Sequence, residues 1–464
     1  MRKEITYAQS NNPQRGVIDI AIKLNNRYTD TRMKKYYQAA LLITAVVSLI
    51  SLLFYRHEYN KLRYVLEVFN YFGKACPEVP KISCPKKFSL DLNEPRSAWQ
   101  RLDDDLYIYS SYVIHNGKIE TISYGKLISP NFDCNIFFNN LLTPIPGIFS
   151  FSIIGNTSDI PGRTAYRGYI LVCEYTEYMI PVGVSFQQKD QILYNPNSSV
   201  FPINIQPKAL TYNGSALCVA PPSNIPMSHT EMLSFLNFHE LIGLNHFVIY
   251  DYGIPNVFHN GIKNMVQDLN PNWNFTYDVI QWNFPIRDIH PNIIRNIITT
   301  DCLYRTYKKV MYTATLSWDE YIVLKFHQIV SDLLIDFEKN KLFGNRFVIE
   351  TQTFCIQQEH QKTSTTAFVP YILRKLYTSP NALNANFLYI YKPHEFLNVK
   401  NIQTLKAAAK LIIASRYVFC NDYNANNVEF NKYEPSILRF AKDITNSTIF
   451  QRYVSGKMFD LKLN

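Results

Sequence analysis

Two acidic motifs directly follow apolar runs of the kind that form buried strands. Asp251 follows residues 246–250 (HFVIY), and Asp319 and Glu320 come soon after the apolar run at 309–316. Acids at the end of a strand can hold a hard divalent cation, or accept hydrogen bonds from a nucleotide. Each motif also has a simpler interpretation, because Asp near Gly commonly caps a turn and paired acids commonly begin a helix.

The segment 213–325 alternates short apolar runs with stretches of helical spacing. Ser228 can N-cap the first helix, with Glu231 at the capping-box position. This alternation predicts parallel strands joined by crossover helices, and such sheets bind ligands at the carboxyl ends of their strands. We therefore expect Asp251 and Asp319 at one edge of a sheet. The expected strands are 216–220, 246–250, 275–281 and 309–316, and the expected helices are 228–244, 256–268 and 291–307.

Residues 88–205 have a different pattern, in which short apolar and aromatic runs are separated by Asn, Gly, Pro and Asp. This pattern predicts a mainly β region. The sequence after residue 87 thus divides into a β-rich region at 88–205 and a second domain at 206–464. The clearest strands expected in the first region are 106–113, 148–154, 168–175 and 179–186.

An apolar run without charge occupies residues 36–55. Twenty helical residues reach about 30 Å, the thickness of the hydrocarbon layer of a bilayer. Five Lys or Arg lie in the fifteen positions before the run and three in the fifteen after it, which places the N-terminus in the cytosol. A cleaved signal peptide and a buried core helix are the alternatives. We expect a single-pass type II protein of the Golgi or another secretory-pathway membrane, with a cytosolic tail (1–35), a transmembrane helix (36–55) and a stem (56–87) that can support oligomerisation.

Five glycosylation acceptor motifs and all eight cysteines follow the apolar run. This distribution predicts a glycosylated, disulfide-containing region in an oxidising compartment. The pairing cannot be derived from the sequence, although Cys76 and Cys84 are close enough to pair. The absence of a Cys-x-x-Cys motif argues against a zinc ribbon or a thioredoxin-like site. The acceptor asparagines are Asn156, Asn197, Asn213, Asn274 and Asn446.

The net charge of +10 does not indicate nucleic-acid binding. Half of that charge lies in residues 1–35, and the remainder forms no basic stripe that could neutralise a series of phosphates. The chain is 47% hydrophobic and 14% aromatic, which is enough for a large folded core.

Several segments between residues 213 and 325 resemble glycosyltransferase family 92 in order and spacing. The most specific are residues 301–305 (DCLYR) and 318–324 (WDEYIVL). The type II layout resembles that family as well. The other matching segments are residues 218–221 (CVAP), Leu244–Asp251 (LNHFVIYD) and 282–285 (WNFP).

The resemblance implies an α/β fold class, with a GT-A-like nucleotide-sugar-binding domain over 206–464. It implies inverting transfer of a hexose, galactose from UDP-galactose, to a glycan acceptor such as a fucosylated N-glycan. It also implies Mn²⁺ or another divalent cation, held by Asp319 with Ser317 beside it. Tyr250 and Asp251 are expected at the nucleotide.

The resemblance places Asp301 and Arg305 on the helix before the metal-binding strand, where they orient that strand or face the diphosphate. A salt bridge between them, one turn apart, is the simpler interpretation. An inverting transfer also needs a carboxylate as general base, and Glu320, Asp422 and Glu429 are the candidates. The sequence contains no Gly-x-Ser-x-Gly and no His-Glu-x-x-His, so it offers no covalent nucleophile.

Two departures from the family pattern leave other functions open. Ser317 stands where the family has its first acid, which removes a charge from the metal site. The closing His-Tyr-Arg of the family has no clear counterpart, since residues 438–440 (LRF) lack the His. One alternative is therefore an inactive family member that acts as a luminal glycan- or protein-binding protein. The other is a membrane receptor ectodomain unrelated to glycosyl transfer.

Overall fold

The computed structural model divides the chain into two compact units, Met1–Pro85 and Lys86–Asn464. In the first unit, the structure describes residues 42–48 and 51, which are helical and exposed. In the second unit, it describes residues 99–103, 105–114, 117–126, 131–139, 141, 143–155, 166–176, 179–188, 200–205, 214–221, 227–268, 275–285, 290–356, 370–378, 387–399, 401–420 and 432–455.

The predicted transmembrane helix at 36–55 and the localisation based on it are wrong. No helix among the described residues is long and apolar enough to cross a membrane. Hydropathy alone suggested the span, whereas a crossing also needs about 20 residues in one continuous helix. The rest of the predicted span, the cytosolic tail (1–35) and the stem (56–87) lie outside the described residues.

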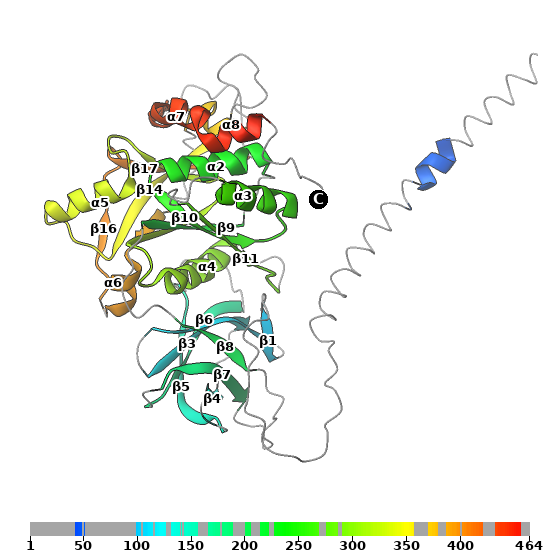
Figure 1. The fold of residues 1–464 in the computed structure, drawn as a ribbon, viewed down its shortest axis with the longest axis vertical. Coiled ribbons are helices and arrows are strands. Elements are labelled where there is room, and N and C mark those ends of the chain that lie inside the picture. The colour runs from blue at the N-terminus through cyan, green and yellow to red at the C-terminus, as the bar shows by residue number, and fades with distance from the viewer. Residues whose placement is uncertain are drawn as a thin grey trace, which may run out of the picture. The chain divides into compact units, whose positions relative to one another are not determined.

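Eight strands between residues 100 and 205 form a sheet that closes into a barrel (Figure 1). They are β1 (Gln100–Asp103), β2 (Leu106–Val113), β3 (Lys118–Lys126), β4 (Phe132–Phe138), β5 (Ile145–Ile153), β6 (Tyr166–Glu174), β7 (Pro181–Gln188) and β8 (Phe201–Ile205). The ring of seven runs β2-β3-β6-β5-β4-β7-β8, and β1 pairs with β2 beside it. A parallel pairing of β8 with β2 closes the ring, with Ile203 opposite Ser111. The β-rich region predicted before residue 206 is therefore a closed barrel.

Nine strands after residue 214 form the second sheet. They are β9 (Ser215–Ala220), β10 (Leu244–Asp251), β11 (Thr276–Gln281), β12 (Tyr312–Ser317), β13 (Glu320–Leu324), β14 (Arg346–Cys355), β15 (Phe387–Tyr391), β16 (Thr404–Lys406) and β17 (Ile412–Val418). Their order is β11-β10-β9-β12-β15-β14-β17-β13, and β16 pairs with β14. The first four strands are parallel, whereas β15 runs antiparallel to both of its neighbours. At the other end of the sheet, β17 is parallel to β14 and antiparallel to β13.

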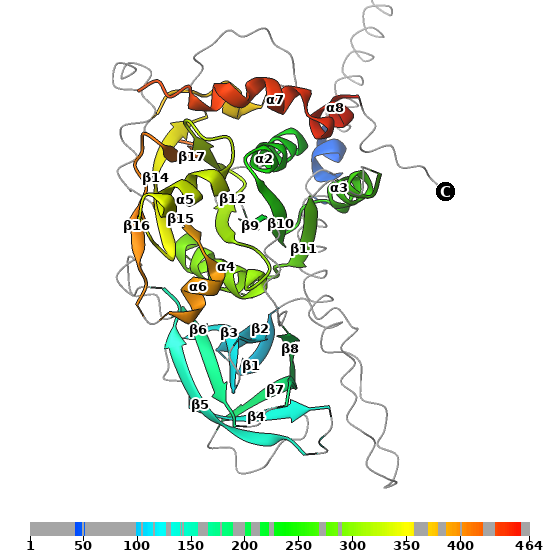
Figure 2. The same ribbon diagram turned by 60° about the vertical axis from the view of Figure 1, so that its left-hand side comes forward.

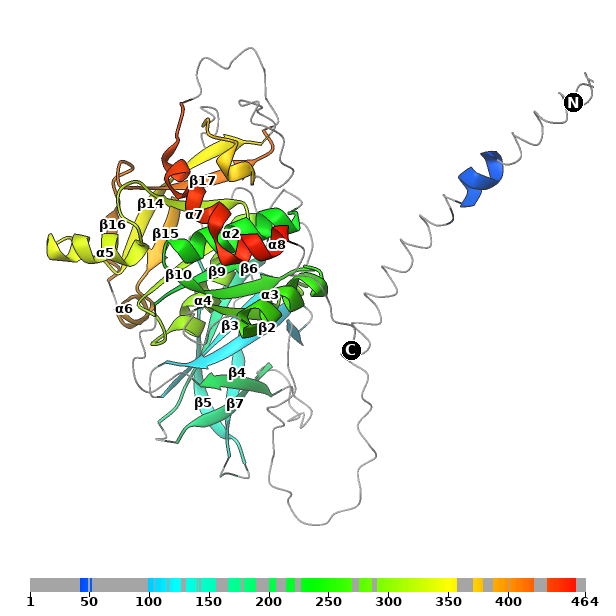
Figure 3. The ribbon, with the colours of Figure 1, turned by 45° about the horizontal axis from the view of Figure 1, so that its top comes forward.

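Three helices connect the four parallel strands, as the sequence predicted. They are α2 (His229–Leu241), α3 (Asn256–Asp268) and α4 (Pro291–Thr306). Helices α2 and α3 cover one face of the sheet, and α4 covers the face toward the barrel (Figures 1 and 2). Two C-terminal helices, α7 (Ala441–Asn446) and α8 (Thr448–Val454), lie beside α2 (Figure 3). The carboxyl ends of the parallel strands thus adjoin the N-termini of these three helices.

Helix α2 begins after the N-cap that the sequence indicated and ends at Leu241, three residues before the expected end at residue 244. The hydroxyl of Ser228 accepts a hydrogen bond from the backbone N–H of Glu231 at 3.2 Å. Gly243 follows the helix with a φ of 86°, a left-handed conformation that glycine adopts without strain. The apolar face of α2 packs against the core of the sheet through Phe235 and Leu236, both fully buried.

Ser228→Ala is expected to lower the free energy of unfolding by about 1 kcal/mol, because the first turn of α2 loses its side-chain cap. Chemical denaturation of the purified full-length chain measures this change. Thr445→Ala provides a control in another helix, since its hydroxyl bonds only to carbonyls of its own helix. A Ser228→Ala variant as stable as the wild type would show that the cap does not stabilise the helix.

The predicted fold class, α/β with a GT-A-like domain and one transmembrane helix, is wrong for this chain. Its described part is mostly β, with a closed barrel before residue 206, a mixed nine-stranded sheet after it, and few helices. The prediction rested on strand–helix alternation before residue 325. It did not anticipate strands β14 to β17, whose pairings with β12 and β13 make the second sheet mixed.

Three disulfides join elements that are distant in sequence. Cys134–Cys173 links β4 to β6, Cys218–Cys302 links β9 to α4, and Cys355–Cys420 links the end of β14 to the residues after β17. Cys76 and Cys84 lie outside the described residues. Among the predicted glycosylation sites, Asn446 is exposed at the end of α7, and the other four asparagines lie outside the described residues.

Candidate functional site

The carboxyl ends of β10, β9 and β12 form one edge of the sheet and bring two predicted site residues to it. Ile249 lies opposite Val219, which lies opposite Leu316, so the three strands end nearly level. Asp251 is the last residue of β10, and Asp319 lies just after β12. Because one strand separates these two strands, their axes are about 10 Å apart. This arrangement matches the edge that the sequence predicted.

The Asp251 carboxylate shapes the loop after β10. One oxygen accepts hydrogen bonds from the backbone N–H groups of Gly253 (3.0 Å) and Ile254 (2.8 Å). The other lies 3.4 Å from Nε2 of the buried His259, whose Nδ1 is 2.9 Å from the Tyr277 hydroxyl. Burial opposes ionisation, but the His259 contact and the two N–H groups hold the pKa of Asp251 below its usual value. Asp251 therefore forms the turn that the simpler interpretation predicted, and its partly exposed carboxylate still faces the edge.

Asp319 lies in the short turn between β12 and β13, and its side chain is fully buried. Neither of its carboxylate oxygens accepts a hydrogen bond from a described residue. Burial, together with the adjacent Glu320 charge, raises the pKa of Asp319 to about 6, although Arg416 and Arg295 act in the opposite direction. A buried carboxylate without donors is costly, and such groups in folded proteins commonly serve a bound ion or ligand.

Glu320 is buried and fully paired. Arg295 of α4 forms an ion pair with one oxygen, which also accepts the backbone N–H of Ser317 at 2.9 Å. Arg416 of β17 lies 3.8 Å from the other oxygen. Burial opposes ionisation, yet the two guanidinium groups outweigh it and hold the pKa of Glu320 below its usual value. This pairing argues against Glu320 as a general base, because a base must release its partners to accept a proton.

The residues at this edge fit a divalent cation only through Asp319. The Ser317 hydroxyl donates to the carbonyl oxygen of Pro221 at 3.3 Å, and Glu320 is committed to its arginines. No group of three His, Cys, Asp or Glu in the described part of the chain could hold a metal on its own. Mg²⁺-like cations at phosphate sites, however, need only one or two carboxylates, because substrate phosphates and water complete the shell. The bare Asp319 carboxylate meets that requirement, and Ser317 does not contribute.

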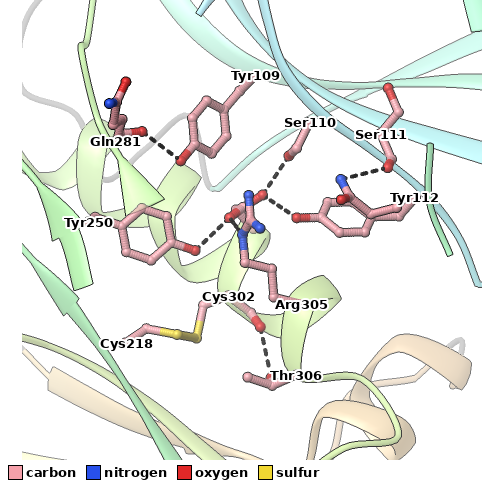
Figure 4. A network of polar contacts seen from close by, with 12 residues as sticks. Tyr109, Ser110, Ser111, Tyr112, Cys218, Tyr250, Gln281, Cys302, Arg305 and Thr306 are labelled. Carbon is pink, nitrogen blue, oxygen red and sulfur yellow. Dashed lines mark hydrogen bonds and ion pairs between the residues drawn. A yellow bond between two sulfur atoms is a disulfide. The ribbon is translucent and has the colours of Figure 1, made fainter. Parts of the chain in front are cut away.

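Asp301, Arg305 and Tyr250 do not join this edge but form a buried network between the sheet and the barrel. Asp301 on α4 accepts hydrogen bonds from the hydroxyls of Ser110 (2.5 Å), Tyr112 (2.6 Å) and Tyr250 (2.6 Å). The Nε of Arg305, one turn later, donates to the same carboxylate at 2.5 Å. Figure 4 shows the three hydroxyls converging beside the Arg305 side chain.

This network accounts for three of the predicted site residues, Asp301, Arg305 and Tyr250, as structural groups. Asp301 is fully buried and its carboxylate receives four donors, so it has no free face for a diphosphate. The salt bridge from Asp301 to Arg305 is the simpler interpretation that the sequence offered. The Tyr250 hydroxyl is committed to Asp301, which leaves Asp251 as the residue of β10 that can face a nucleotide.

Sequence reasoning missed three residues near the edge. Arg295 and Arg416 neutralise Glu320, and Glu231, recognised only as a capping residue, lies at the start of α2. Only the position of Glu231 at the start of the helix that follows the first parallel strand could have indicated a site. Of the other candidates, Asp422 and Glu429 lie outside the described residues. Residues 438–440 contribute Arg439, which donates to the carbonyls of Leu324 and Phe326.

Comparison with known proteins adds no relative: no protein family matches this sequence, and no curated protein is similar to it. The resemblance to glycosyltransferase family 92 therefore remains a prediction from the matching segments.

Proposed function

We propose that this protein transfers a hexose from a UDP-sugar, UDP-galactose in the first instance, to a glycan acceptor with inversion at the anomeric carbon. The matched segments between residues 213 and 325 suggest the reaction. The observation that carries the proposal is the bare, buried carboxylate of Asp319 at the same strand edge as Asp251. Ligands of parallel sheets bind at such an edge.

The charges at the edge are compatible with a nucleotide diphosphate and a cation. When both acids are ionised, Asp319 and Glu320 balance Arg295 and Arg416. A divalent cation and the two charges of a nucleotide-sugar diphosphate also cancel, so binding the pair leaves the net charge of the site unchanged. Asp319 would hold Mn²⁺, which neutralises the diphosphate leaving group when bound. Asp251 would fix the loop that contacts the ribose or base.

A second candidate is an inactive family member that binds a glycan or a protein. Two observations favour it. Ser317 bonds to Pro221 and provides no charge to a cation, and Glu320 is held by two arginines. Both candidates predict a folded protein, but only the first predicts release of UDP when a UDP-sugar and an acceptor are present together.

Calorimetric titration of UDP into the purified full-length chain tests the proposal, with Mn²⁺ in one arm and EDTA in the other. We expect binding in the Mn²⁺ arm and at least tenfold weaker binding with EDTA, because the cation bridges Asp319 and the diphosphate. Asp319→Asn should abolish the metal-dependent part, since a neutral amide is a poor ligand for a hard cation. UDP release from UDP-galactose with a mixed glycan acceptor pool then measures turnover.

Asp133→Asn is the matched control for this titration. Asp133 is exposed on β4 of the barrel, so its replacement should leave UDP binding unchanged. A folded wild-type chain that binds no UDP in either arm would rule out the transferase. Metal-dependent UDP binding without turnover on any acceptor would favour the inactive binding protein.

A further inference from the structure

Glu231 lies at the same sheet edge as Asp251 and Asp319. Strand β9, the middle strand of the edge, ends at Ala220, and α2 begins at His229. Glu231 is in the first turn of α2, on the face of the sheet away from α4. The edge therefore carries three acids, one from each of the segments that follow β10, β9 and β12.

The Glu231 carboxylate is held by one oxygen only. Its Oε1 accepts the backbone N–H of Tyr371 at 3.2 Å. Its Oε2 is buried and has no hydrogen-bond partner among the described residues. Burial raises the pKa of Glu231 to about 7, against the opposing effects of the Tyr371 N–H and the nearby Arg374 charge. A carboxylate that acts as a general base needs one oxygen held in place and the other free to accept a proton, and Oε1 and Oε2 of Glu231 have this arrangement.

Tyrosines connect Glu231 to Asp319. The Tyr371 ring contacts the Tyr417 ring at 4.8 Å, and the backbone N–H of Tyr417 donates to the carbonyl of Asp319 at 2.9 Å. The charges of both Glu231 and Asp319 raise the pKa of the Tyr371 hydroxyl, after the larger effect of burial. Burial, the neighbouring Tyr371 and the charge of Glu231 raise the pKa of the fully buried Tyr321 hydroxyl in the same cluster.

The cluster of Glu231, Asp319 and the neighbouring tyrosines differs from a pair of acids that serves the fold alone. Asp319 is fully buried, and its carboxylate accepts no hydrogen bond from a described residue, so it is a second, independent indication of a ligand at this edge. Protein interiors rarely leave several polar atoms unsatisfied in one place. Carboxylate and hydroxyl groups in this arrangement match the chemistry of a sugar, whose hydroxyls both donate and accept hydrogen bonds.

We propose that Glu231 is the general base of the transfer reaction and that it binds the attacking hydroxyl of the glycan acceptor. This inference rests on the proposed function. The acceptor oxygen forms a bond to the anomeric carbon of the hexose as the bond from that carbon to the diphosphate oxygen breaks. The hydroxyl proton passes to Oε2 of Glu231, and UDP leaves with the bonding electrons. Glu231 then releases the proton to water.

Glu231 suits this role better than Glu320. Both oxygens of Glu320 face guanidinium groups, and removing it from them would leave two buried cations without a counter-charge. Asp319 adjoins these arginines and is assigned to the cation. The charged and titratable groups around Glu231 are Arg374, Tyr371, Tyr321 and Tyr417. None of the three tyrosines ionises in the physiological range, so Glu231 is the group of this set that can exchange a proton there.

Glu231→Gln in the full-length chain tests the inference. The amide oxygen can still accept the Tyr371 N–H, so the fold is preserved while the base is lost. We expect kcat for hexose transfer to fall by about 10²–10⁴-fold, with the Kd for UDP in the presence of Mn²⁺ unchanged. The wild-type rate should decline as the pH falls through about 7, the raised pKa of the buried Glu231, and this acidic limb should vanish in the variant.

Ser228→Ala is the matched control, because it removes the cap of the same helix without removing the carboxylate. It should lower the melting temperature and leave kcat and the pH profile intact. If Glu231→Gln lowers the melting temperature so far that the chain does not fold, the rate and the pH profile of Glu231→Asp are measured instead. A reduced rate with a displaced acidic limb supports the inference, and an unchanged rate and limb overturn it.

The outcomes separate this inference from the proposed function. Full transfer by Glu231→Gln overturns the role of Glu231 and leaves the transferase standing. A wild-type chain that binds no UDP and releases none from UDP-galactose overturns both. Loss of transfer together with loss of UDP binding in a folded Glu231→Gln chain also overturns the inference, because a general base for the acceptor is not needed to bind the donor.

Discussion

Asp301→Asn is expected to destabilise the unit Lys86–Asn464 by about 3–5 kcal/mol, because it breaks a buried network and leaves the partly buried Arg305 guanidinium without its counter-charge. The Asp301 carboxylate accepts four hydrogen bonds, and all four partners are donors. An asparagine side chain has one oxygen and one NH₂ group. Its NH₂ would therefore face a donor, either Arg305 and Tyr250 or Ser110 and Tyr112.

Denaturant-induced unfolding of the full-length chain, followed by intrinsic fluorescence, measures this change. Asp133→Asn is the control, since the exposed Asp133 on β4 should change the free energy of unfolding by about 0.5 kcal/mol or less. A second variant, Tyr112→Phe, removes one of the four donors and should cost less than Asp301→Asn. An Asp301→Asn chain as stable as the control would show that the network does not hold the barrel and the sheet together.

Asp319→Asn is expected to have the opposite effect on stability and to remove function. The wild-type carboxylate is buried without donors, and its pKa in the folded chain is about 6, above the ordinary value of 3.8. A raised pKa means that the folded state favours the protonated form. The stability that this gives is complete below about pH 4 and is lost as the pH rises through about 6. A neutral amide at this position avoids the loss.

The size of the effect follows from the shift in pKa. We expect Asp319→Asn to be more stable than the wild type by about 3 kcal/mol at about pH 7.5, and by about 1 kcal/mol at about pH 4.5. Thermal and denaturant unfolding at both pH values measures the difference, with Asp133→Asn as the reference. A variant less stable than the wild type at the higher pH would show that Asp319 has a stabilising partner. If Asp319→Asn is more stable than the wild type and no longer binds UDP, the Asp319 carboxylate serves binding at the expense of stability.

The sequence predicted the local elements better than their assembly. The structure places the helices α2, α3 and α4 within a few residues of the expected ranges, and Ser228 caps α2 as the sequence predicted. The alternation in β2 and β6 was equally clear. The closing of β2 on β8 was not predictable, because strand pairing across about 90 residues leaves no local pattern.

The class of the second sheet could not be predicted for a related reason. Strand β17 is a short, largely apolar run, and it pairs with β14 and with β13, almost 90 residues earlier in the chain. Such runs fit a buried strand or a short helix equally well. The membrane prediction rested on hydropathy, and no helix of the described ranges is long and apolar enough to span a bilayer.

The candidate site was predicted in part. Asp251 and Asp319 were expected at one edge because both follow parallel strands, and the structure places them there. The roles of Asp301 and Arg305 depend on Ser110 and Tyr112, which lie almost 200 residues earlier, so no spacing in the sequence reveals their contact. The sequence could not show that one oxygen of Glu231 has no hydrogen-bond partner among the described residues. A glutamate in the first turn of a helix is expected for capping alone, so its presence there does not indicate a second role.

The Asp301 network also sets an order of events during synthesis. The barrel is complete in sequence at residue 205, but the acceptor for its Ser110 and Tyr112 hydroxyls comes about 100 residues later. At about 5–20 residues per second, a ribosome needs about 5–20 s to reach Asp301. Until then the hydroxyls of Ser110 and Tyr112, on the face of the barrel that packs against α4, lack their acceptor, and this face of the barrel stays uncovered. Chains stalled before α4 should therefore present a barrel that opens readily to proteases, whereas chains stalled after α4 should not.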